Sequence, residues 1–274
     1  MFIRQNDMGM TSADIEFVYL AFGLLLMAVP LFYLWRLRTG LLAATVIATL
    51  RMCVQLLLTG IYLRYLFLWD CPWVNLLWVV MMVGVASHTA VSRTRLRPGV
   101  LLLPVFVGFF VTAMLVGLYF LGLVLQLDNI FGAQYFIPVM GILLGNMLSV
   151  NVVALEMYYS DVQREQQMYY YLLGNGATRF EATAPFLRRA VIKAFSPCIA
   201  NMAVLGVVSL PGTMIGQILG GSQPGIAVKY QMMITVITVA ASMLSLMITV
   251  ALSAYRSFDA FGRLLPVFRR EKHK

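Results

Sequence analysis

The chain has 274 residues, of which 61% are hydrophobic and only 11% are charged. A soluble domain carries about a quarter charged residues, so this composition excludes an ordinary soluble protein and indicates one embedded in a membrane. The net charge of +9 is then best explained by the excess of Lys and Arg in the cytoplasmic loops of membrane proteins, and we expect no nucleic-acid partner.

Apolar runs long enough to cross a bilayer recur along the whole chain. A spanning helix needs about 20 such residues, and helices are expected because lipid offers no partner to unpaired backbone groups. The runs cover residues 15–35, 41–68, 72–92, 99–125, 131–158, 195–219 and 226–254. They predict an all-α integral membrane protein of about seven transmembrane helices, in a single domain over residues 1–274. The three cysteines are scattered and form no metal-ligand pattern.

The basic residues predict the orientation of these spans. With seven spans, sixteen of the 20 Lys and Arg residues fall on one face: Arg36, Arg38, Arg93, Arg95, Arg97, Arg164, Arg179, Arg188, Arg189, Lys193, Arg256, Arg263, Arg269, Arg270, Lys272 and Lys274. Cytoplasmic loops carry this excess. We therefore expect the N-terminus outside, the C-terminus in the cytoplasm, a cytoplasmic loop at about 160–194 and a basic cytoplasmic tail at about 255–274.

The cytoplasmic loop contains the signals of a short helix. Gly174 and Gly176 can adopt the positive φ that ends a helix. Thr178 and Glu181 have the Thr-x-x-Glu spacing of a capping box, in which each side chain accepts a hydrogen bond from the other residue's backbone. Pro185 follows and is expected to bend the chain. The prediction is a short helix over about 179–184, too small to be stable without a docking partner.

Polar groups inside the predicted spans are candidates for a translocation pathway, since such groups are costly in lipid and mark pathways or pairs. These are Arg51, Gln55, Asn146, Ser149, Asn201 and Ser209, and Pro211 is added as a candidate because it leaves a backbone carbonyl unpaired. Two alternatives stay open: Arg51 contacts substrate or pairs structurally with Glu156, and Asn146 and Ser149 line the route or hold helices together. Pro211 and Gly212 open backbone carbonyls and favour a hinge.

Several segments resemble one family of permeases. They are "LRMCVQLLLTGIYLRYLF" (50–67), "PVMGILLGNMLSVNVVALEMYY" (138–159), "GAT" (176–178), "GVVSLPGTMIGQILGG" (206–221) and "AVKYQMMIT" (227–235). Together they are similar to the FetB-type (UPF0014) permeases, an iron-export family that includes plant aluminium-tolerance proteins. "GAT" before a short helix is also similar to the coupling loop of ABC transporter permeases, which docks on the ATPase subunit.

The resemblance implies a multi-pass permease subunit of the inner (plasma) membrane. Two copies would pair with two copies of a separate ABC ATPase, which binds ATP and Mg, while this chain binds no cofactor. The cargo would be iron, another metal ion or a metal-linked solute, moved outward. Where the family carries polar residues, this chain has Ala200 and Ala203, so the cargo stays open. The coupling residues would be Gly176, Ala177, Thr178, Arg179, Phe180 and Glu181.

The chain itself is not expected to be an enzyme, because no Gly-x-x-x-x-Gly-Lys-Ser/Thr motif occurs and two histidines cannot build a catalytic centre. The alternative function is an ion-gradient-driven secondary transporter of a small solute. Such carriers usually show paired repeats or mid-span acidic residues, and we see neither. The 18 methionines leave a soft-metal site open, although flexible packing explains methionine in spans equally well.

Overall fold

The computed structural model describes residues 17–94, 96–259, 262–265 and 267–268. Arg95, the first two residues of the first predicted span and the basic residues after Phe268 lie outside these ranges. The described residues fold into helices and turns, and the β-bridges among them are isolated and form no strand.

Among the described residues, five helices are long and apolar enough to span a membrane. They are α3 (Leu42–Trp69), α4 (Pro72–Arg93), α5 (Pro98–Tyr119) with its π-helical extension η1 (Phe120–Val124), α6 (Ala133–Arg164) and α10 (Pro224–Ser257). They match the second to fifth and the seventh predicted runs to within a few residues, except at the C-terminal end of α6, which extends six residues further. The all-α membrane class is therefore confirmed, while the sidedness of the spans stays a prediction.

The first predicted span is broken into α1 (Phe17–Leu25) and α2 (Ala28–Arg36). The expectation of one helix over 15–35 was wrong. Pro30 has no N–H to donate to the carbonyl of Leu26, and that carbonyl instead accepts from Val29 N at 3.2 Å. Hydrogen bonds between residues three apart therefore replace the α-helical ones here, and α2 begins at Ala28.

The loop and sixth span also differ from the prediction. A short helix, α7 (Gln166–Gly174), follows α6, and one helix, α8 (Arg179–Val204), then runs through both Pro185 and Pro197. The separate helix over 179–184 and the bend at Pro185 were wrong. So was the continuous span over 195–219, because the chain leaves the helix after Val204 and resumes as α9 (Gly212–Leu219).

Packing explains why α8 does not bend at its first proline. Ala182, Phe186 and Ala190, spaced four residues apart, are all buried in the core, so one helical face continues across Pro185. The hydrogen bond lost there would have ended on the carbonyl of Glu181, in the exposed first turn where water can replace it.

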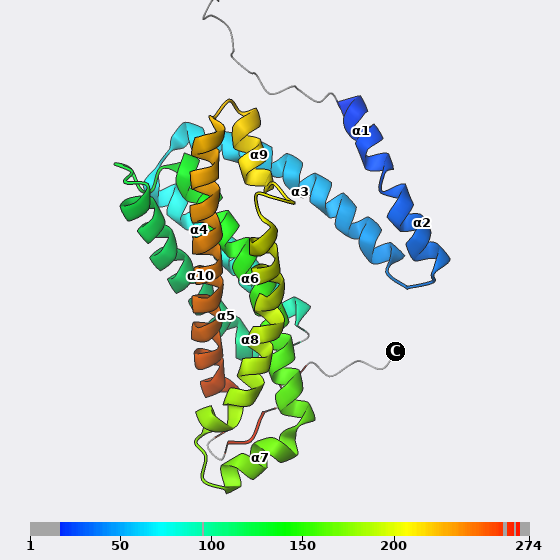
Figure 1. Cartoon of the computed structure of the whole chain (residues 1–274), viewed down its shortest axis with the longest axis vertical. Coiled ribbons are helices and arrows are strands. Elements are labelled where there is room, and N and C mark those ends of the chain that lie inside the picture. The colour runs from blue at the N-terminus through cyan, green and yellow to red at the C-terminus, as the bar shows by residue number, and fades with distance from the viewer. Residues whose placement is uncertain (1–16, 95, 260–261, 266, 269–274) are drawn as a thin grey trace, which may run out of the picture. The chain divides into compact units, whose positions relative to one another are not determined.

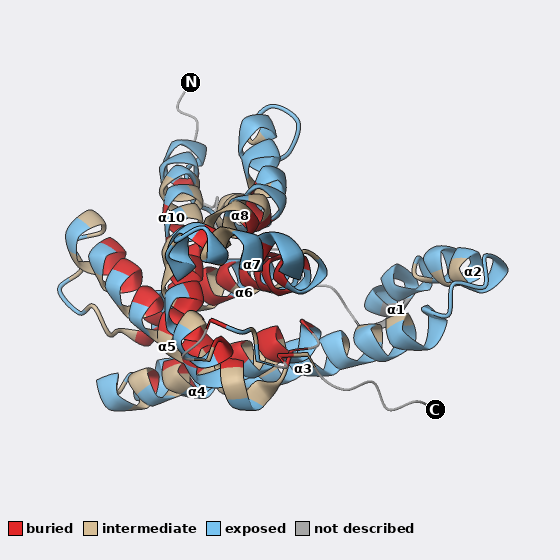
Figure 2. Ribbon diagram, turned by 90° about the horizontal axis from the view of Figure 1, so that it is seen from below, coloured by how far each residue is buried: buried red, intermediate tan, exposed pale blue. Residues whose placement is uncertain are grey.

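The chain divides into two units, residues 1–69 with 215–227 and residues 70–214 with 228–274. The first unit contains α1 to α3, whose apolar side chains are largely exposed, as in Figure 2. Within it, the hairpin between α2 and α3 is held by Thr39, whose hydroxyl donates to the carbonyl of Leu34 at 3.3 Å. Exposed apolar side chains on a spanning helix suit contact with lipid.

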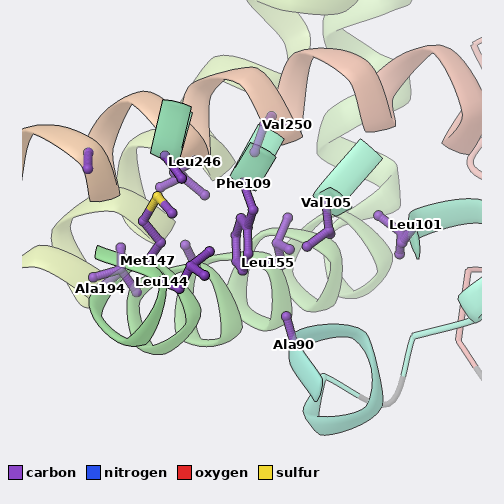
Figure 3. Packing of buried hydrophobic residues seen from close by; sticks show 14 of the residues in the cluster. Ala90, Leu101, Val105, Phe109, Leu144, Met147, Leu155, Ala194, Leu246 and Val250 are labelled. Carbon is purple, nitrogen blue, oxygen red and sulfur yellow. The ribbon is translucent and has the colours of Figure 1, made fainter. Parts of the chain in front are cut away.

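The second unit holds the core. Its central helix, α6, packs against α4, α5 and α8, and Asn151 of α6 donates to Ser245 Oγ of α10 at 2.9 Å. Phe109, Leu155 and Leu246, from three different helices, point toward one another in Figure 3. The hydrogen bond from Asn151 joins α6 to α10.

The helices α5 and α10 approach each other closely at Gly108. A Cβ added at Gly108 would meet the Thr249 side chain, Ser245 O at 3.2 Å and Thr249 N at 3.3 Å. Two of these three atoms are backbone and cannot rotate away. Gly108 therefore sets the distance between the two helices.

Candidate functional site

The α7–α8 end of the second unit contains the predicted coupling residues. Figure 1 shows α7 lying across the end of the bundle where α6 ends and α8 begins. This helix was not predicted from the sequence: the short helix expected over 179–184 is part of α8, whereas α7 lies before Gly176. The site is built from the bend after α6, α7 itself, the α7–α8 turn and the segment after α10.

Four charged side chains fix the bend between α6 and α7. Arg189 of α8 lies 3.2 Å from Asp161 Oδ2 and donates to Glu165 Oε2 at 2.9 Å. Arg164 donates to Asp161 Oδ1 at 2.8 Å. Asp161 is only 1% exposed, and a buried carboxylate is tolerated where it is paired. The hydrogen bond from Arg189 holds the pKa of Glu165 below its usual value. This cluster joins α6 to α8.

The helix α7 is anchored on one face and exposed on the other. Tyr169 is buried, and its hydroxyl donates to Gly262 O at 2.9 Å, while its ring lies 5.6 Å from that of Phe258. On the other face Met168, Tyr170 and Tyr171 are exposed, Tyr171 by 71%. Tyr169, together with the partly buried Leu172 and Leu173, thus anchors a helix that presents apolar and aromatic groups outward.

The segment after α10 packs onto the same end of the bundle. Leu265 N donates to Ser257 O at 2.8 Å, and Arg97 N donates to Val267 O at 2.7 Å. Phe258 and Val267 are buried. The described part of the predicted tail therefore links α7 and α10 to the turn between α4 and α5.

The α7–α8 turn is a Schellman motif. Gly176 has φ +88°, its N–H donates to Leu173 O at 3.0 Å, and Ala177 N donates to Leu172 O at 3.1 Å. This is the arrangement that ends a helix on a residue with positive φ. The expected role of Gly176 as a helix terminator is confirmed, whereas the positive φ also expected of Gly174 was wrong, because Gly174 is the last helical residue of α7.

The capping box that follows is also confirmed. Thr178 Oγ1 accepts from Glu181 N at 3.3 Å, and Glu181 Oε2 accepts from Thr178 N at 2.8 Å. The backbone hydrogen bond from Thr178 lowers the pKa of the Glu181 carboxyl below its usual value. With both motifs in place, the backbone from Gly176 to Glu181 is held rigidly.

Phe180 extends from this turn and is 75% exposed. It borders a cavity of about 500 Å³. The walls come from Tyr158 of α6, from the first turns of α8 and from the last turns of α10, including Val250 and Tyr255. The turn therefore combines a fixed backbone with an exposed aromatic side chain and an apolar hollow.

The predicted pathway residues divide between the two units. Arg51 and Gln55 are exposed on α3 in the first unit. Asn146 and Ser149 are exposed on one face of α6 in the second unit, as predicted from their spacing, and Asn201 is exposed near the end of α8. Since Arg51 and Glu156 belong to different units, the proposed ion pair between them stays a prediction, as does a common pathway.

Ser209 and Pro211 lie in the interruption between α8 and α9. Gly206 has φ +84° and donates its N–H to Ser209 O at 2.9 Å. Ser209 N in turn contacts Val204 O at 3.3 Å, which closes a compact turn with Val207 exposed at its tip. The helix is therefore interrupted over residues 205–211, and the movement of this segment as a hinge stays a prediction.

Sequence reasoning missed the charged cluster and the anchoring role of Tyr169. The spacing of Asp161 and Glu165, one helical turn apart with Arg164 between them, was a usable signal. Nothing in the sequence indicated Arg189 as their partner. Among the described residues, no group of three or more His, Cys, Asp or Glu side chains lies close enough to hold a metal ion.

The long apolar helices and their packed bundle define this chain as an all-α, multi-pass membrane protein. The chain belongs to the family described as "Uncharacterised protein family (UPF0014)", whose model matches residues 17–258. The resemblance noted in the sequence is therefore confirmed.

Relatives cover most of this chain. It is 29% identical to the UPF0014 membrane protein YjkA of Bacillus subtilis over 91% of this chain and 98% of that protein. It is 33% identical to the rice UPF0014 membrane protein STAR2, over 86% and 79% of the two chains. It is 32% identical to the probable iron export permease protein FetB of Escherichia coli, over 76% and 78%. No solved structure matches the chain.

Proposed function

We propose that this chain is the permease subunit of an ABC transporter that exports iron or another metal ion, or a metal-linked solute, across the inner membrane. A separate ATPase subunit supplies ATP hydrolysis, with two copies of each chain in the complex. The similarity to a protein named as a probable iron export permease supports metal as the cargo.

The observation that carries the proposal is the α7–α8 turn. Its backbone is fixed by a Schellman motif and a capping box, and Phe180 and Tyr171 are more than two-thirds exposed beside it. Exposed apolar groups on a rigid element are typical of a protein-docking surface. On the predicted cytoplasmic face, the partner that the proposal requires is the ATPase.

Two neighbouring glycines provide a matched test. Gly176→Ala places a side chain at φ +88°, a backbone region that costs roughly 1–2 kcal/mol for an L-residue. Gly174→Ala lies in the last turn of α7, where an added Cβ meets nothing within 4 Å. We expect Gly176→Ala to weaken co-purification of the ATPase and metal-stimulated ATP hydrolysis, and Gly174→Ala to leave both unchanged.

Transport in proteoliposomes separates this function from secondary transport. We expect metal efflux to require the ATPase and ATP and to be insensitive to the proton and sodium gradients. Efflux that proceeds without an ATPase and follows an ion gradient would identify a secondary transporter. Retention of ATPase binding and coupled transport after the whole α7–α8 turn is scrambled would also contradict the proposal.

A further inference from the structure

One face of α6 is exposed and polar along four turns of a spanning helix. At 100° per residue its positions fall within an arc of about 100°. We call it the α6 polar face, and it consists of Gly145, Asn146, Ser149, Val153, Glu156 and Ser160. Of these six residues, only Val153 has an apolar side chain, and Gly145 has no side chain.

The exposed faces of the neighbouring spans have the opposite composition. Trp73, Leu77, Met81 and Val85 are exposed on α4, and Leu103, Val111, Leu115 and Leu123 are exposed on α5 and η1. Such faces suit lipid. A face with an amide, two hydroxyls and a carboxylate does not, because polar groups in hydrocarbon cost several kcal/mol when unsatisfied. The α6 polar face is therefore not a lipid-facing surface.

The hydrogen bonds on this face leave acceptors available. Asn146 Nδ2 donates to Ile142 O at 2.9 Å, and Ser149 Oγ donates to Gly145 O at 3.0 Å. Each side chain donates a hydrogen bond within its own helix, and its oxygen keeps lone pairs that can bind a ligand.

Glu156 adds a charge to these oxygens. The other carboxylate of α6, Asp161, is paired with Arg164 and Arg189. Glu156 is exposed one and a half turns earlier, and within the described part of the chain its carboxylate has no hydrogen-bond or ion-pair partner. A face that offers oxygen acceptors and one negative charge is complementary to a cation.

We propose that the α6 polar face lines a water-filled route for a divalent cation and that the Glu156 carboxylate recognises this cation at the end of the route nearest α7. The inference rests on the proposed transport of metal and deepens it. One carboxylate with neutral oxygen ligands attracts a cation without trapping it, as conduction requires.

Cysteine labelling tests the water-filled route without the ATPase. In full-length protein with Cys53, Cys71 and Cys198 replaced, single cysteines are placed at Asn146 and Ser149, with Val111 and Leu115 of α5 as controls. In liposomes, we expect a water-soluble methanethiosulfonate to label the α6 positions at least tenfold faster than the controls. Equal rates would overturn the inference, because another part of the protein, a second copy or lipid would then cover the face.

The role of Glu156 is tested in the Ser149→Cys protein with Mn²⁺ as the probe. We expect millimolar Mn²⁺ to slow labelling at least threefold, Glu156→Asp to retain this protection and Glu156→Gln to abolish it. Equal protection with and without the carboxylate would overturn cation recognition by Glu156. So would restoration of transport to Glu156→Gln by Arg51→Gln, which would indicate a structural ion pair. Loss of ATPase coupling with intact labelling and Mn²⁺ protection would instead contradict only the proposed function.

Discussion

Thr178→Ala should loosen the first turn of α8 while the bundle stays folded. The substitution removes the hydroxyl that accepts from Glu181 N at 3.3 Å. Loss of a Ser or Thr N-cap costs about 1 kcal/mol. Since Thr178 and its neighbours are exposed and lie outside the packed core, the cost should appear as local opening of the turn. A difference of about 1 kcal/mol raises an opening constant about fivefold at 25 °C.

Hydrogen exchange on the reconstituted transporter measures this opening directly. We expect about fivefold lower protection at the amides of Glu181 and Ala182, which donate to Thr178, and normal protection from Phe186 onward, together with weaker coupling of ATP hydrolysis to transport. Thr178→Ser keeps a capping hydroxyl and should behave as the parent protein. Unchanged protection in Thr178→Ala would refute the capping argument. Full coupling despite an opened turn would show that coupling does not need its rigidity.

Three further outcomes follow from the same structure. Gly108→Ala should destabilise the α5–α10 crossing by about 1–3 kcal/mol, a fall of roughly 2–12 °C in melting temperature, while Gly84→Ala, with nothing within 4 Å of its added Cβ, should not. Arg189→Gln breaks the charged cluster and should lower the melting temperature, whereas Arg188→Gln, next to it and exposed, should not; equal effects would contradict the pairing. Because the folded-state pKa of Glu181 is depressed, its stabilisation of the turn is present above the unfolded pKa and lost as pH falls through the folded pKa. Exchange protection of the turn, corrected for intrinsic rates, should therefore decline below about pH 4.5, and Glu181→Gln should remove this dependence.

Features determined by neighbouring residues were predictable from the sequence. The capping box of Thr178 and Glu181 depends on residues three positions apart, and the terminating role of Gly176 depends on its own backbone freedom. The long spans were predictable because lipid requires helices wherever about 20 apolar residues occur together.

Features determined by tertiary contacts were not predictable. Pro185 should bend an isolated helix, but burial of Ala182 and Phe186 on either side keeps α8 continuous. Arg189 reaches Glu165 across 24 positions of the chain, and no local pattern connects them. Only knowledge of the α6–α8 contact could have identified the charged cluster as the joint between these helices.

The continuity of α8 changes how the proposed coupling would work. A bend at Pro185 would have absorbed any movement of the α7–α8 turn near its source. An unbroken helix of 26 residues is about 39 Å long, and it connects Thr178 at one end to the turn over Leu205–Pro211 at the other. A force applied at Phe180 would then be transmitted along α8 to the non-helical segment over residues 205–211. Since α8 is fastened to α6 through Arg189, the same force would also move the helix that carries Glu156.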